Sequence, residues 1–129
     1  MPKVAVYAIG GNALQNPSSA NSTDSAEVLA KVMSDVIDLL ESGWGVILTH
    51  GNGPQVGHLM QLDGDLSHTM DEWVSATQGM IGHSLALHLD SILLKRRRPE
   101  RTACIITRVE VDPRCLLYTS DAADEQQRG

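Results

Sequence analysis

Residues 44–57 read Trp44-Gly45-Val46-Ile47-Leu48-Thr49-His50-Gly51-Asn52-Gly53-Pro54-Gln55-Val56-Gly57, and this stretch decides the fold. Its first half is an apolar run that predicts a buried strand. Gly51 and Gly53 lack Cβ atoms, so the backbone there can take positive φ and approach a ligand closely. Pro54 suits the first turn of a helix. The stretch predicts strand, glycine turn and helix start, where unpaired amides and the helix dipole favour an anion. An ordinary tight turn without a ligand is the alternative.

A second turn of the same kind occurs earlier in the chain. The apolar run of residues 4–9 predicts another strand, and Gly10, Gly11 and Asn12 follow it. The carboxyl ends of parallel strands lie at the same edge of a sheet, so both turns should face one cleft. Asn12 and Asn52 can add side-chain donors for the oxygens of a ligand. Together the two turns predict a cradle for a phosphate or carboxylate group.

Helical patterns occupy most of the remaining chain. Apolar residues recur at helical spacing over residues 27–41, with a capping-box pattern at Asp24 and Glu27 and a helix stop at Gly43. Strand, helix and strand of this length make a right-handed βαβ unit. Residues 54–62 predict a short helix. We expect a third parallel strand over residues 103–107, in which Cys104 is buried.

The longest predicted helix runs from about Met70 to Lys95. Acidic residues stand near its start and basic residues near its end, which suits the helix dipole. Gly79 and Gly82 interrupt the pattern and indicate either close packing or a helix break. The candidates for its buried faces are Trp73, Ala76, Met80, Leu87, Ile92 and Leu93.

Composition excludes several classes of function. The chain has 129 residues, 42% of them hydrophobic, and a formal net charge of −6. Such a charge argues against general affinity for nucleic acid or an anionic membrane, and the apolar runs are too short to span a bilayer. The basic run of residues 95–98 lacks interleaved aromatics and fits a solvated helix end. Two cysteines make no disulfide framework, and no signal segment opens the chain, which predicts a cytoplasmic protein. The five histidines show no metal-ligand spacing, and only His50 is expected near a ligand.

Four blocks resemble carbamate kinases, a family within the amino-acid kinase superfamily. They are Ile9-Gly10-Gly11-Asn12-Ala13, His50-Gly51-Asn52-Gly53-Pro54-Gln55-Val56-Gly57, Thr77-Gln78-Gly79-Met80-Ile81-Gly82 and Thr107-Arg108-Val109-Glu110-Val111-Asp112-Pro113. The second block distinguishes carbamate kinases from their relatives. Many of those relatives carry a lysine two residues before the first glycine pair, where this chain has Ala8, as carbamate kinases do.

The resemblance covers residues 3 to about 114, the opening part of such an enzyme. It implies an α/β fold in which a parallel sheet carries helices on both faces, as a truncated part of a three-layer αβα sandwich. It also implies a cytoplasmic homodimer that transfers phosphoryl groups reversibly between ATP and carbamate, with Mg²⁺ on the nucleotide, often at the end of arginine breakdown. We assign Gly11, Asn12 and Asn52 to catalysis, and Gly10, Gly11, Asn12, Gly51, Asn52 and Gly53 to substrate binding.

Residues 1–114 place no lysine at either turn. The cations that oppose developing phosphoryl charge must then come from a further part of such an enzyme, as must most of the nucleotide site. We expect the chain by itself to be inactive. Two other functions stay open: a kinase of the same superfamily with a different carboxylate or phosphate acceptor, and an anion-binding module without catalysis.

The end of the chain departs from the family pattern. From Cys115 the sequence turns polar, and one back-translation of residues 115–125 resembles a transposase-end adapter of sequencing libraries. We therefore expect residues 115–129 to be translated adapter, with a natural polar tail as the alternative.

Overall fold

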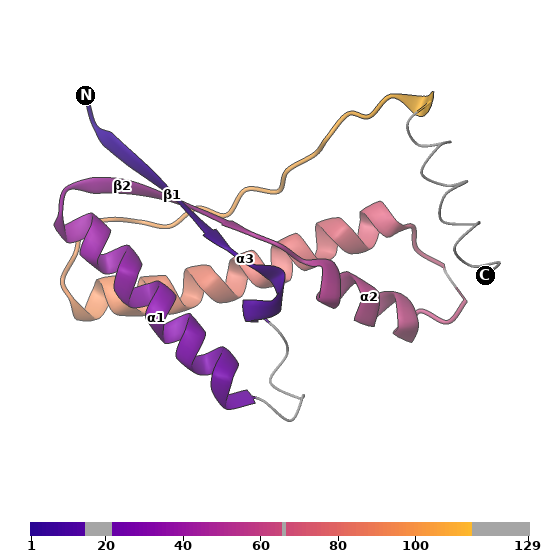
Figure 1. Ribbon diagram of the computed structural model, residues 1–129, viewed down its shortest axis with the longest axis horizontal. Helices are drawn as coiled ribbons and strands as arrows, with labels where there is room; N and C mark the ends of the chain where they lie inside the picture. The colour runs from indigo at the N-terminus through magenta and orange to yellow at the C-terminus, as the bar shows by residue number, and fades with distance from the viewer. Residues whose placement is uncertain (15–21, 66, 115–129) are drawn as a thin grey trace.

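The computed structural model describes residues 1–14, 22–65 and 67–114. Its elements follow one another as a strand, a short 3₁₀ turn, a helix, a second strand and two further helices (Figure 1). They are β1 (Lys3–Ile9), η1 (Gly11–Leu14), α1 (Ser22–Glu41), β2 (Trp44–His50), α2 (Gly53–Leu62) and α3 (Met70–Lys95). No helix within these residues is long and apolar enough to cross a bilayer.

The sheet consists of β1 and β2, which pair in parallel. Lys3 lies opposite Trp44, and the register continues without a bulge to Ile9 opposite His50. The α/β class, the parallel pairing and the helix between the two strands are therefore as expected. A helical crossover is what a parallel pair requires, because a tight turn cannot join two strands that run in the same direction.

Helix α1 supplies the densest part of the core. Val32, Met33, Val36 and Ile37 are each at most 4% exposed. The helix begins at Ser22, so Asp24 lies inside its first turn and the predicted cap at Asp24 is wrong. The predicted stop is confirmed, because Gly43 has a φ of 82° and donates its amide to the carbonyl of Leu40.

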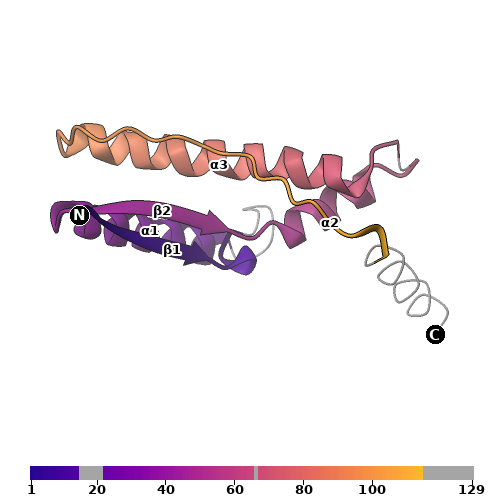
Figure 2. The same cartoon turned by 90° about the horizontal axis from the view of Figure 1, so that it is seen from above.

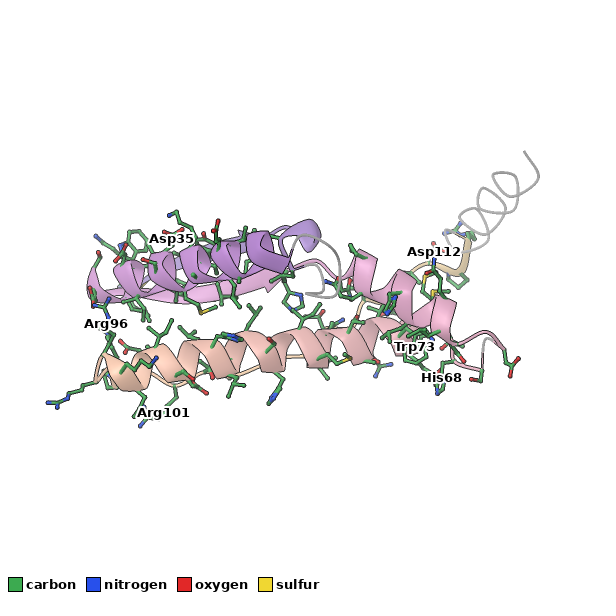
Figure 3. The ribbon with its side chains drawn as sticks, turned by 90° about the horizontal axis from the view of Figure 1, so that it is seen from below. Asp35, His68, Trp73, Arg96, Arg101 and Asp112 are labelled. Carbon is green, nitrogen blue, oxygen red and sulfur yellow. The ribbon has the colours of Figure 1, made fainter. Side chains whose placement is uncertain are left out.

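A polar contact joins β1 to α1. The Tyr7 hydroxyl donates to Asp35 at 2.7 Å, and Lys31 donates to the same carboxylate at 2.6 Å. The bonds from Lys31 and Tyr7 lower the pKa of Asp35, whereas the bond to Asp35 raises the pKa of Tyr7. Asp35 faces outward along α1 (Figure 3).

Helix α3 has the predicted bounds, and its buried face agrees with the prediction at Leu93 but not throughout. Leu85 and Leu93 are 5% and 3% exposed, and Leu85 belongs to the same core as Ile9 and α1. Met80 and Leu87, which we expected inside, are 62% and 57% exposed. Apolar residues occur all around this helix, so spacing alone does not select one face. The helix continues through Gly79 and Gly82, which excludes the break. Of the two alternatives, close packing is found at Gly82, against Cys104, and not at Gly79.

The expected third strand is not formed. Residues 99–112 run back along α3 without pairing to the sheet (Figure 2). The Gln78 side chain takes up both backbone groups of Thr107, accepting from its amide at 2.8 Å and donating to its carbonyl at 3.4 Å. Cys104 is exposed rather than buried. Strand propensity alone does not form a strand, because the backbone also needs a neighbouring strand to pair with. Here the Gln78 side chain takes the place of such a neighbour at Thr107.

Only one face of the sheet is covered by the described helices. Ala5, Tyr7 and Ile9 alternate inward, whereas Val4 and Val6 on the other face are 52% and 67% exposed. Ile47 of β2 is likewise 52% exposed on that face. The expectation of helices on both faces is therefore met on one face within the described residues.

Candidate functional site

The parallel register brings the two glycine turns together. Ile9 and His50, the last residues of the strands, are directly opposite each other. The amide of Gly51 donates to the carbonyl of Ile9 at 3.3 Å, which extends the pairing one step beyond the sheet. The predicted meeting of the two turns is thus present. Because its amide is used by β1, Gly51 contributes no free donor in this arrangement.

The start of α2 leaves amides unpaired. Asn52 is the N-cap residue, with φ −146° and ψ 8°, and its side chain makes no capping hydrogen bond. Among the described residues, the amides of Gly53 and Gln55 have no backbone partner, and Pro54 carries none. An added Cβ at Gly53 would meet nothing within 4 Å. The turn therefore offers two N–H donors and open space at the positive end of a helix dipole.

Backbone strain plays no part at these glycines. The described residues with positive φ are Gly43 and Arg97, so Gly10 and Gly53 adopt conformations open to other residues. The positive φ that glycine permits at Gly53 is not used, because this residue already belongs to the first turn of α2. What glycine provides there is the absence of a side chain in front of the amides.

The first turn is a 3₁₀ helix that begins at Gly11. The amide of Ala13 donates to the carbonyl of Gly10 at 3.0 Å, and Asn12 lies within this tight turn. Gln55 joins the two turns, because its Nε2 donates to the carbonyl of Leu14 at 2.7 Å. Its Oε1 is buried and finds no hydrogen-bond partner among the residues that the structure describes. Sequence reasoning missed this bridge, which spans 41 residues of chain.

Asn52 is held by α3. Its Nδ2 donates to Thr77 Oγ1 at 2.9 Å and to the carbonyl of Val74 at 3.3 Å. We expected this nitrogen to donate to the oxygens of a ligand, and the structure corrects that expectation. The side-chain oxygen is the atom of Asn52 that a ligand can use.

His50 is turned toward its own backbone. Its Nδ1 lies 3.1 Å from the carbonyl oxygen of Gly51, which fits a role in shaping the turn. Elsewhere in the described residues, no group of three or more His, Cys, Asp or Glu side chains lies close enough to hold a metal ion.

A second polar cluster, which sequence reasoning missed, closes the turn between α2 and α3. Asp63 accepts from the Ser67 hydroxyl at 2.7 Å, the His68 amide at 3.1 Å and Trp73 Nε1 at 3.2 Å. These bonds, that of Ser67 foremost, lower the pKa of Asp63 to about 2. His68 and Trp73 lie side by side at this end of α3, with ring centroids 4.9 Å apart (Figure 3). A carboxylate whose pKa is about 2 is a weak base, so the cluster positions the turn rather than activating Ser67 as a nucleophile.

None of the three lysines within the described residues lies at the glycine turns. Lys31 pairs with Asp35, Lys3 lies over the Trp44 ring at 5.4 Å, and Lys95 ends α3. The structure thus keeps them where the sequence suggested, away from the candidate site.

Comparisons with known proteins agree with this geometry. The chain is 38% identical over 120 residues to carbamate kinase 1 of Enterococcus faecium and 34% identical over 120 residues to the carbamate kinase of Pyrococcus horikoshii. These alignments cover 88% and 87% of the chain, which spans 38% of the length of either relative. No protein-family model matches the chain.

Solved structures give the same result. The carbamate kinase of Giardia lamblia bound to AMP-PNP superposes with a TM-score of 0.71 at 25% sequence identity, covering 87% of this chain and 37% of the other. A second structure of the Giardia enzyme superposes with a TM-score of 0.72. The chain is therefore related to the carbamate kinases in both sequence and fold, over most of its own length and less than half of theirs.

Proposed function

We propose that this chain is part of a carbamate kinase, which transfers a phosphoryl group reversibly between ATP and carbamate to give ADP and carbamoyl phosphate. The proposal is supported by the relatives, which carry that name, and by a Giardia carbamate kinase structure with the ATP analogue AMP-PNP. Phosphoryl transfer asks little covalent chemistry of a protein and much positioning and charge stabilisation. We further propose that the complete protein is a cytoplasmic homodimer that serves arginine breakdown.

The register of the two strands links the proposal to particular residues. The register of β1 and β2 places the turn of Gly10, Gly11 and Asn12 beside the free amides at the start of α2. Donors fixed before the reaction stabilise charge that develops on phosphoryl or carboxylate oxygens, at no cost in reorganisation. In this arrangement the amides of Gly10, Gly53 and Gln55 face the oxygens, while Gly51 holds the turn to β1.

Residues 1–114 form the carbamate-binding part in this proposal. The nucleotide, with its Mg²⁺ on the phosphates, is bound mostly by a further part of the enzyme. A bound Mg²⁺ would supply positive charge against the phosphates of the nucleotide. Residues 115–129 lie outside the described residues, and we propose that they are translated adapter. The raw sequencing read tests this, because a library made with different adapters that still encodes them would contradict it.

The function is tested on the completed gene. We expect ATP synthesis from ADP and carbamoyl phosphate, and no phosphorylation of N-acetylglutamate. The reverse pattern would assign the protein to another kinase of the superfamily. Binding of carbamoyl phosphate without turnover would indicate a binding module.

The site is tested in the same enzyme by Asn12→Ala. Loss of one oxyanion donor costs about 10²–10³ in kcat. We expect a decrease of that order with an unchanged melting temperature. A variant with unchanged kinetics would remove Asn12 from the catalytic group.

A further inference from the structure

We propose that Thr77 is a positioning residue that sets the orientation of the Asn52 amide, and that Asn52 thereby accepts a hydrogen bond from the amino group of carbamate or carbamoyl phosphate. This inference rests on the function proposed above. It assigns Thr77 to selectivity between carbamoyl and acyl substrates.

Thr77 is placed for this task by burial and by two hydrogen bonds. It is the one buried polar residue of the described chain, 1% exposed, in the first half of α3. Its hydroxyl donates to the carbonyl of Val74 at 3.0 Å and accepts from Asn52 Nδ2 at 2.9 Å. A hydroxyl that gives its only proton to a helix carbonyl has lone pairs alone left for other partners.

The partners of Asn52 determine which atom faces α3. A carbonyl oxygen such as that of Val74 can only accept, and the Thr77 hydroxyl has already donated its proton. Both groups therefore need a donor, which is the amide nitrogen of Asn52. A flipped amide would place its oxygen against two acceptors, with no proton for a hydrogen bond. The orientation of Asn52 thus follows from α3. No partner for its Oδ1 occurs among the described residues, so this oxygen is available to a ligand.

An available oxygen changes what the site selects. The amides of Gly53 and Gln55 offer donors to oxygens, while Asn52 offers an acceptor. A phosphate or carboxylate oxygen brings no proton to an acceptor. The amino group of carbamate does, beside a carboxylate that suits the amides. The set of donors and acceptor therefore matches a molecule with N–H at one end and oxygens at the other.

The test uses the complete enzyme and two substrates of the same shape. Carbamoyl phosphate carries an amino group where acetyl phosphate carries a methyl group, so their kcat/KM ratio in ATP synthesis reports the N–H contact. Thr77→Val removes the hydroxyl, and Thr77→Ser keeps it. Thr102→Val is the matched control, because it removes a hydroxyl that bonds to Asp90 at 2.9 Å, at the far end of α3.

We expect Thr77→Val to lower the preference for carbamoyl phosphate by about tenfold or more, since a site built around an N–H contact loses selectivity when that contact is misplaced. Thr77→Ser and Thr102→Val should keep the wild-type ratio. An active, folded Thr77→Val enzyme with the wild-type ratio would overturn the role of Thr77. Wild-type enzyme without ATP synthesis from carbamoyl phosphate would instead overturn the proposed function.

A second measurement does not depend on turnover. In NMR spectra of the wild-type protein, the side-chain amide protons of Asn52 should exchange slowly with solvent, because both donors are bonded. Thr77→Val should accelerate this exchange, and Thr77→Ser should not. If Thr77→Val does not fold, the wild-type spectrum still tests the proposal. Rapid exchange of the Asn52 side-chain amide protons would overturn the assignment of both protons to bonds with α3.

Discussion

At the scale of single residues, Asp63 has the strongest electrostatic perturbation in the described chain. Its pKa is lowered to about 2, chiefly by the Ser67 hydroxyl, with the His68 amide and Trp73 contributing. Ser67→Ala should raise that pKa toward 3.8, the ordinary value, as measured by NMR titration of the carboxylate in the complete protein. Ser75→Ala is the control, because that hydroxyl donates to the carbonyl of Glu72 and has no bond to Asp63. An unchanged titration in Ser67→Ala would contradict the assignment.

The same carboxylate makes the turn sensitive to acid. A carboxyl whose pKa is lower in the folded state stabilises that state above its unfolded pKa of 3.8 and loses this contribution as pH falls through about 2. Between pH 4 and pH 2, the melting temperature of the wild-type protein should therefore decrease more than that of Asp63→Asn, which has no carboxyl to protonate at this position. Parallel curves for the two proteins over this range would contradict the prediction.

At the scale of elements, α3 ends in a Schellman motif without glycine. The Arg98 amide donates to the carbonyl of Leu93 and the Arg97 amide to that of Leu94, with Arg97 at φ 54°. A left-handed conformation destabilises the folded state by roughly 1–2 kcal/mol when the residue has a Cβ. Glycine removes this cost, but it also raises the conformational entropy of the unfolded chain, which cancels part of the gain. Arg97→Gly should stabilise the complete protein by about 0.5–1 kcal/mol in urea unfolding. Arg96→Gly, at φ −85°, should give no such gain.

A second prediction concerns the contact between α3 and residues 99–112. A Cβ added at Gly82 would overlap Cys104 Sγ and lie 3.5 Å from its Cβ. Gly82→Ala should therefore displace this segment. In a Cys104→Ala background the same change should instead stabilise the protein by about 1 kcal/mol, because alanine is favoured over glycine inside a helix. A double-mutant cycle measures the coupling. Gly79→Ala, where an added Cβ meets nothing, is the control. Additive effects would show that the segment does not touch Gly82.

At the scale of the whole molecule, the uncovered apolar surface is the dominant feature. Val6 and Ile47 lie on the open face of the sheet, and Ile105 and Val109 are 79% and 82% exposed on the unpaired segment. Unpaired edges and apolar faces recruit other chains. Residues 1–129 alone should therefore be aggregated or loosely packed, as judged by size-exclusion chromatography with light scattering and by thermal unfolding. They should also show no detectable ATP turnover. A monodisperse product with a cooperative thermal transition would contradict the first part, and carbamoyl-phosphate-dependent ATP synthesis the second.

Sequence reasoning succeeded where the physical signal is local. The bounds of α3, the helix stop at Gly43 and the meeting of the two turns follow from charge, left-handed glycine and parallel pairing. It failed where the outcome depends on distant partners. The carbonyl of Val74 and the hydroxyl of Thr77, which decide the role of Asn52, lie 22 and 25 residues further along the chain. No local sequence pattern predicts such contacts.

The register of β1 and β2 also determines which changes in chain length the site can accept. Both strands have seven residues, and they begin and end opposite each other. One residue inserted into either strand would shift one turn past the other by about 3.3 Å and turn the following side chains to the opposite face. Helix α1 lies outside this constraint. Natural variation in length should therefore accumulate between the strands and be absent within them.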